Sequence, residues 1–112
     1  MPSKEIWVFH GTAPKNIPLI MEGGFKVGGK APGVGVANGT VYGNGVYSAK
    51  GPGTPMCYSK SGGGKAVILA RALQGNIGPQ GSPSSDCWEP QGDWAIFRDG
   101  SQLLPLYVVH YT

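Results

Sequence analysis

Apolar residues along the chain gather in short runs, separated by stretches rich in glycine, proline and serine. Short runs of apolar, β-branched and aromatic residues that end at turn residues are typical of buried β-strands. The sequence therefore predicts about five strands and, at 25–27, a brief further one. The five lie over residues 6–10, 45–49, 66–73, 94–97 and 106–111, with a turn signal at Asp99-Gly100 between the last two.

Residues 14–24 differ from these runs because their apolar positions recur at helical spacing. A proline stands near the start of the segment and two glycines close it, which are usual start and stop signals of a helix. A second helical turn is expected over residues 54–59. One or two short helices with about five strands predict an α+β sheet domain.

Two segments, 28–45 and 74–92, are rich in glycine, proline or serine and predict loops. The first contributes few side chains to a core because so many of its residues are glycines. Loops of this length inside a compact domain are usually functional or disordered. We therefore expect residues 28–45 to border a binding site.

The chain has 112 residues, which is enough for one domain, and we expect residues 1–112 to form a single unit. Its 20 glycines and 10 prolines approach the composition of disordered chains, but 40% hydrophobic and only 13% charged residues indicate a folded protein. The net charge is +3, with the basic residues scattered singly. This pattern argues against a nucleic-acid or membrane surface and suits an anionic small molecule.

Several classes of protein are disfavoured. No run approaches the ~20 apolar residues of a membrane-spanning helix, and the first residues lack the layout of a signal peptide, so we expect an intracellular protein. Cys57 and Cys87 are too few for a disulfide framework and show no metal-ligand spacing, so we expect free thiols and no bound metal. The glycine clusters at 43–45 and 62–64 lack the other residues of a nucleotide-binding P-loop.

What remains is a set of motifs in a fixed order along the chain. His10-Gly11-Thr12 ends the first strand, Tyr47 lies in a Gly-x-Gly-x-Tyr-Ser-Ala pattern, Tyr58 comes 11 residues later, and Asp93 stands directly before a strand. In order and spacing this set resembles the catalytic domain of the poly(ADP-ribose) polymerase-like (PARP-like), diphtheria-toxin-type ADP-ribosyltransferases, over about residues 6–111.

The resemblance implies a compact, mostly antiparallel split β-sheet with one or two short helices and long glycine-rich loops, in a minimal, toxin-like form. It also implies that NAD is the substrate, without a metal, and that the bond between nicotinamide and ribose is cleaved. ADP-ribose would then pass as a single unit to a macromolecular acceptor, protein or nucleic acid, from an enzyme that acts as a monomer. An NAD glycohydrolase, with water as acceptor, and a non-catalytic module that binds NAD or ADP-ribose are the alternative interpretations.

By the same resemblance, the tyrosines and the first motif contact NAD. Tyr58 stacks on the nicotinamide ring and Tyr47 lines the opposite side, because a flat ring binds well between aromatic walls. Gly11 offers its N–H and C=O to the carboxamide, since glycine lets a ligand approach the backbone closely. His10 binds a hydroxyl of the adenosine ribose, and Thr12 contacts the same end of the cofactor. His10 and Tyr47 are also expected among the catalytic residues.

Asp93 carries the catalytic hypothesis. The family often has glutamate there, whose carboxylate holds the 2′-hydroxyl of the nicotinamide ribose and polarises the acceptor. Asp93 keeps this charge with one methylene less of reach. Glu89 is the alternative acid. A hydroxyl that helps to hold the carboxamide would come from Ser48, which we include among the cofactor-binding residues, or from Thr54.

Overall fold

The computed structural model describes residues 4–25, 45–53, 55–56, 64–80, 82–90 and 92–111 of the chain. The elements described in full are six strands, one α-helix and two short 3-10 helices. The strands are β1 (Glu5–His10), β2 (Val46–Ala49), β3 (Ala66–Leu73), β4 (Cys87–Trp88), β5 (Trp94–Phe97) and β6 (Leu103–His110). The helices are η1 (Pro14–Asn16), α1 (Ile17–Gly23) and η2 (Gly100–Gln102).

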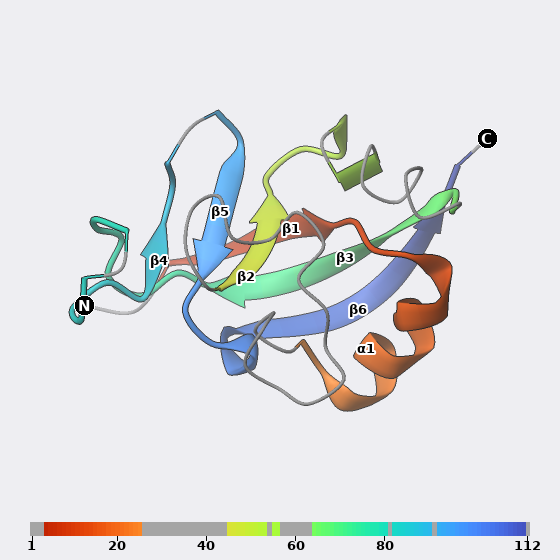
Figure 1. The fold of residues 1–112 in the computed structure, drawn as a ribbon, viewed down its shortest axis with the longest axis horizontal. Coiled ribbons are helices and arrows are strands. Elements are labelled where there is room, and N and C mark those ends of the chain that lie inside the picture. Colours follow the sequence, from red (N-terminus) through yellow and green to blue (C-terminus); the bar gives the residue numbers. More distant parts are fainter. Residues whose placement is uncertain are drawn as a thin grey trace.

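The six strands of the described residues join in one sheet in the order β4-β5-β2-β1-β3-β6, and every neighbouring pair is antiparallel. Helix α1 packs beside β6, at the end of the sheet away from β4 (Figure 1). The predicted α+β class with a mostly antiparallel sheet is therefore confirmed. None of the helices formed by the described residues is long and apolar enough to cross a membrane.

Most predicted strand bounds agree with the structure, and the differences have local causes. β6 begins at Leu103 rather than at residue 106, because it pairs with most of β3 through a register shift between Leu69 and Ala70. The sequence does not predict β4, which is two residues long and lies in a segment with the composition of a loop. Phe25 is buried but forms no strand, and the rest of the brief strand expected at 25–27 lies outside the described residues.

The helix forms where the sequence predicts it. It ends before Gly24, whose φ of 83° is a left-handed value that glycine adopts without steric cost. The Gly24 N–H donates to the carbonyl oxygen of Ile20 at 2.8 Å and closes the last turn. In the second helical turn, expected over residues 54–59, the described residues 55–56 are helical. The side chains of α1 that pack on the buried core are Ile17, Ile20 and Met21.

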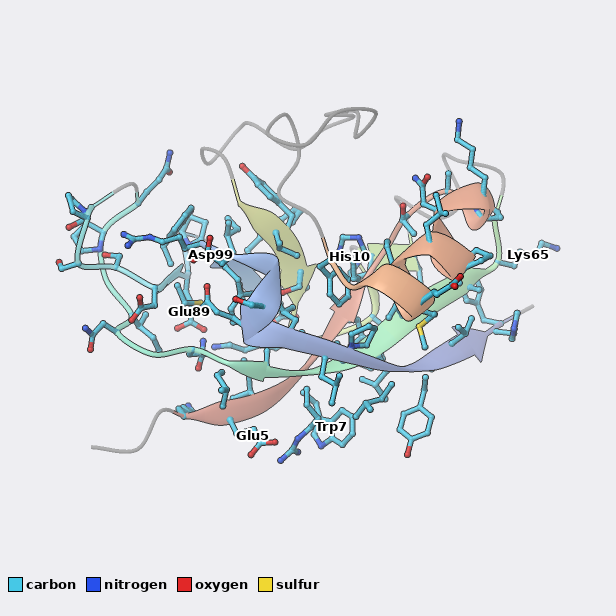
Figure 2. The ribbon with its side chains drawn as sticks, turned by 90° about the horizontal axis from the view of Figure 1, so that it is seen from below. Glu5, Trp7, His10, Lys65, Glu89 and Asp99 are labelled. Carbon is cyan, nitrogen blue, oxygen red and sulfur yellow. The ribbon has the colours of Figure 1, made fainter. Side chains whose placement is uncertain are left out.

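The register of the strands divides their side chains between two faces, because opposite residues of antiparallel strands point to the same side. The face that carries α1 holds the core and is called the inner face below. The other, outer face exposes Trp7 and Tyr107, whose ring centroids are 6.3 Å apart. Figure 2 shows Trp7 and Glu5 on the outer face and His10 on the side of α1. Fully buried side chains of the inner face are Val8, Ile68, Ala70 and Phe97.

Candidate functional site

His10 is the last residue of β1, and its ring lies on the inner face beside α1 (Figure 2). Its Nδ1 lies 2.7 Å from the carbonyl oxygen of Tyr47. Because a carbonyl oxygen only accepts hydrogen bonds, Nδ1 carries the hydrogen and donates it. The ring also meets Phe25 edge-on, with centroids 5.0 Å apart. These two contacts fix the tautomer and the orientation of His10.

Burial decides the charge of His10. It lowers the pKa of the imidazole from its ordinary value, and the hydrogen bond to the Tyr47 carbonyl, which raises the pKa, offsets only part of this effect. His10 is therefore neutral at pH 7. With Nδ1–H donating to Tyr47, Nε2 is the acceptor atom of the ring, which suits a sugar hydroxyl.

Gly11 lies against the segment that follows β2. A methyl group built on Gly11 would lie 1.9 Å from the carbonyl oxygen of Pro55, so only glycine fits. The first motif therefore touches the helical turn that leads on from Tyr47. Beside it, Thr12 Oγ1 accepts a hydrogen bond from Asn16 Nδ2 at 3.1 Å, which ties the end of the motif to the start of α1.

Tyr47 lies in β2 with its ring on the outer face, according to the register of β1 and β2. The ring meets Trp94 edge-on, with centroids 5.6 Å apart and an angle of 83° between the planes. Trp94 is the first residue of β5 and follows Asp93 directly. The structure thus links Tyr47 to His10 through its backbone carbonyl and to β5 through its ring. It does not bring the His10 and Tyr47 side chains together.

Ser48 is the predicted site residue whose role the structure corrects. Its side chain is 2% exposed, and its Oγ donates to the carbonyl oxygen of Ala95 at 2.6 Å. The hydroxyl hydrogen joins β2 to β5 and is not available to hold a carboxamide. Thr54, the other hydroxyl considered for that task, lies outside the described residues.

Asp93 is exposed and lies at the turn that leads into β5. Its carbonyl oxygen accepts a hydrogen bond from the Lys50 N–H at 2.9 Å. Its carboxylate lies over Gly51, where an added methyl group would be 3.0 Å from Oδ2. The register of β1, β2 and β5 puts His10 and Asp93, which directly precedes β5, on the same face; β2 lies between β1 and β5, so about 10 Å of sheet width separates the two residues.

Glu89, the alternative acid, is held by two partners. It forms an ion pair with the Lys50 ammonium, and its Oε2 accepts a hydrogen bond from Gln74 Nε2 at 3.4 Å. Partial burial alone would raise the pKa of Glu89, but the hydrogen bond and charge of Lys50, helped by Gln74, hold it below its ordinary value. Glu89 is therefore ionised and paired. The sequence does not predict the roles of Lys50 and Gln74. Lys50 follows β2 and Gln74 follows β3, and nothing in either segment indicates that both side chains contact Glu89.

Of the remaining predicted features, the two cysteines, Tyr58 and the glycine-rich loop, the structure describes only some. Cys87 is a free, buried thiol, and burial raises its pKa, so it is a poor nucleophile. Cys57 and Tyr58 lie outside the described residues, as do positions 28–44 of the glycine-rich loop. The stacking of Tyr58 on nicotinamide therefore stays a prediction. Within the part of the chain that the structure describes, no three metal-ligating side chains come together.

The geometry can be compared with known proteins. No protein-family model matches the sequence, and no curated protein matches it. The fold, in contrast, matches the crystal structure of the PARP domain of Arabidopsis RADICAL-INDUCED CELL DEATH1 with a TM-score of 0.63. The chain has a PARP-like fold. The match covers 95% of this chain and 66% of that chain, at 14% sequence identity.

This likeness confirms what the ordered motifs indicate about the architecture. At 14% identity it shows the PARP-like fold alone, so activity and ligand must be argued from the site. The chain spans about two thirds of the length of the Arabidopsis domain. The compact PARP-like fold still contains β1 and β2, which carry His10 and Tyr47, and β5, which Asp93 directly precedes.

Proposed function

We propose that this chain binds NAD at the end of β1, cleaves the bond between nicotinamide and ribose, and transfers ADP-ribose as a single unit to a macromolecule. The observation that carries the proposal is the fixed, neutral His10, whose Nδ1–H donates to the Tyr47 carbonyl at 2.7 Å within a PARP-like fold. Such a histidine presents Nε2 as an acceptor to a ribose hydroxyl. Water as the acceptor of ADP-ribose would make the same site an NAD glycohydrolase.

The neighbouring residues have separate tasks in this proposal. The backbone of Gly11 borders the carboxamide of nicotinamide, and Thr12 borders the adenosine end. The Tyr47 ring, which meets Trp94 edge-on, lies on the face opposite His10 and Asp93, so in this proposal Tyr47 contributes the backbone carbonyl that orients His10. Tyr58 would supply the aromatic wall for nicotinamide.

Asp93 stabilises the developing charge. As the bond from C1 of the ribose to the nicotinamide nitrogen breaks, its electron pair leaves with nicotinamide, and the ribose gains oxocarbenium character. A carboxylate near the ribose favours that charge and accepts a hydrogen bond from the 2′-hydroxyl. The acceptor then bonds to C1 and loses its proton.

One observation favours a second function, a module that binds NAD or ADP-ribose without turnover. Asp93 is shorter than glutamate and is exposed, so its carboxylate is less firmly held than a buried acid. Binding through His10 and Gly11 does not require that carboxylate.

Release of nicotinamide from NAD separates these functions. We expect the parent protein to release nicotinamide and Asp93→Asn to lose most of this release while still binding NAD. Asp99→Asn is the matched control, because Asp99 is an exposed acid at the start of η2 where asparagine caps equally well. Binding without any release by the parent would establish the module instead. Labelled NAD added to a lysate, followed by protease or nuclease, identifies the acceptor class.

A further inference from the structure

Lys50 touches both ends of the loop that presents Asp93. This loop, Glu89–Asp93, joins β4 to β5. The Lys50 N–H donates to the Asp93 carbonyl oxygen at 2.9 Å, at one end of the loop. The Lys50 ammonium forms an ion pair with the Glu89 carboxylate, at the other end. One residue that directly follows β2 therefore closes the loop twice, once through its backbone and once through its side chain.

Gln74, which directly follows β3, is a second partner of Glu89 at the first end of the loop. Its side chain is 0% exposed, and its Nε2 lies 3.4 Å from Glu89 Oε2 and 3.6 Å from Cys87 Sγ. Its Oε1 is buried without a hydrogen-bond partner among the described residues. Rotating the amide would turn Oε1 toward the Glu89 carboxylate and lose the attraction, so the observed orientation is the one that chemistry favours. Gln74 thus leaves one buried oxygen without a partner while its Nε2 donates to Glu89, a contact with a charged acceptor that offsets part of this cost.

The loop needs such an anchor. Gly92, with φ of 57°, turns the chain immediately before Asp93, and the Asp93 side chain is exposed. The position of the carboxylate therefore follows from the position of the backbone that carries it. That backbone is fixed where the Lys50 N–H meets the Asp93 carbonyl.

We propose that Lys50 is a positioning residue for Asp93, and that Glu89 and Gln74 hold Lys50 in place. The catalytic consequence rests on the function proposed above, whereas the structural claim does not. Lys50 acts through Asp93 and is not itself a group that touches the reacting atoms. The assignment also gives Glu89 a task other than that of an alternative catalytic acid.

The experiment combines amide hydrogen exchange with steady-state kinetics of nicotinamide release. Lys50→Met removes the ion pair and keeps the length of the side chain, Lys50→Arg restores the charge, and Glu89→Gln removes the pair from the other side. We expect Lys50→Met and Glu89→Gln to speed exchange of the residue 50 amide at least about tenfold. Each should also lower kcat about tenfold to a hundredfold, the cost of a small misplacement, with little change in KM. Lys50→Arg should recover most of both losses.

Two controls separate positioning from a general structural role. In the Asp93→Asn background, Lys50→Met should lower kcat no further, because the carboxylate that Lys50 positions is already absent. Glu5→Gln breaks a comparable ion pair on the outer face and should leave exchange at residue 50 and kcat unchanged. An equal loss of kcat from Lys50→Met with and without Asp93 would overturn the proposal. So would unchanged exchange at residue 50 in both Lys50→Met and Glu89→Gln.

Failure of the proposed function gives a different result. A parent protein that releases no nicotinamide overturns catalysis, while the exchange of the residue 50 amide still decides whether Lys50 and Glu89 hold the loop. Because Glu89→Gln removes the same pair without altering residue 50, the test survives if Lys50→Met folds poorly.

Discussion

Two ion pairs lie on opposite faces of the sheet. On the outer face, Arg71 Nε lies 2.7 Å from Glu5 Oε1, and the two side chains are 33% and 50% exposed. On the inner face, Lys50 pairs with Glu89, whose side chain is 26% exposed. The groups are chemically alike. What differs is the structure that each pair holds.

The outer pair joins β1 to β3, which are already paired over six residues. Arg71 also lies over the Trp7 ring, 4.6 Å from its centroid, so the guanidinium keeps a partner without Glu5. The inner pair instead anchors the Glu89–Asp93 loop, whose other end carries the proposed catalytic carboxylate. The inner pair thus holds a segment between two strands, whereas the outer pair lies on strands that the sheet already joins, and the predictions below test this difference.

The largest effect is expected at the end of the loop itself. Asp93→Asn keeps the shape of the side chain but removes its charge, so kcat for nicotinamide release should fall by about 10²–10³. Asp93→Glu should hold or raise kcat if the loop places residue 93 as PARP-like enzymes place their glutamate. Glu89→Gln should cost less than Asp93→Asn. The reverse order would transfer the catalytic role to Glu89.

Next in size is a steric test beside Asp93. A methyl group on Gly51 would lie 3.0 Å from Asp93 Oδ2, so Gly51→Ala should displace the carboxylate and lower kcat about tenfold to a hundredfold. Gly53→Ala is the matched control, because no atom of the residues that the structure describes lies within 4 Å of its added methyl group. Equal activity of the two alanine variants would contradict the placement of the Asp93 side chain.

A smaller effect is expected at the far end of the site. His10→Ala removes a hydrogen bond that we expect to be equal in ground and transition states, so affinity for NAD should fall about tenfold while kcat changes little. Calorimetry with NAD measures this loss. His110→Ala changes the other histidine of the chain, which is exposed at the end of β6, and should leave affinity unchanged. A collapse of kcat with constant affinity would show that His10 acts at the breaking bond.

The smallest effect concerns stability. Because the folded-state pKa of Glu89 is lowered from 4.5, its pair stabilises the protein above about that pH and loses this contribution as pH falls through the lower, folded-state pKa. Glu89→Gln should therefore lower the free energy of unfolding by about 1 kcal/mol at pH 7 and by less near pH 3. Urea unfolding at both values measures it. Arg71 also lowers the pKa of Glu5, so Glu5→Gln should lower stability at pH 7 too, but by less than Glu89→Gln because the Glu5 carboxylate is more exposed. A larger loss from Glu5→Gln than from Glu89→Gln would reverse the contrast between the two pairs.

The sequence predicts much of this fold because most of its strands are marked by apolar runs that can be identified without knowing their partners. The run at 66–73 and the run at 94–97 have the bounds of β3 and β5 without correction. β4 could not be predicted, since two residues in a loop-like segment become a strand only through the partner strand β5. The early start of β6 likewise depends on the length of β3 and not on its own composition.

The site was predictable only in part, for a related reason. The order of His10, Tyr47 and Asp93 indicates the fold, and strand pairing then links each of them to the next. Ser48 could not be judged from sequence, because its partner is a backbone carbonyl on β5. Lys50 and Gln74 gain their roles from a contact with Glu89 that only the folded chain creates.

The close approach of Gly11 to Pro55 means that a glycine at position 11 in every homologue would have a steric cause. Any larger residue at position 11 would meet a backbone oxygen that no rotamer can avoid, so purifying selection would keep glycine there whether or not a relative binds NAD. Invariance of Gly11 among homologues would then be a signature of packing. His10 would meet the proposed ligand through its side chain, so substitution at position 10 is the change expected to accompany loss of the ligand.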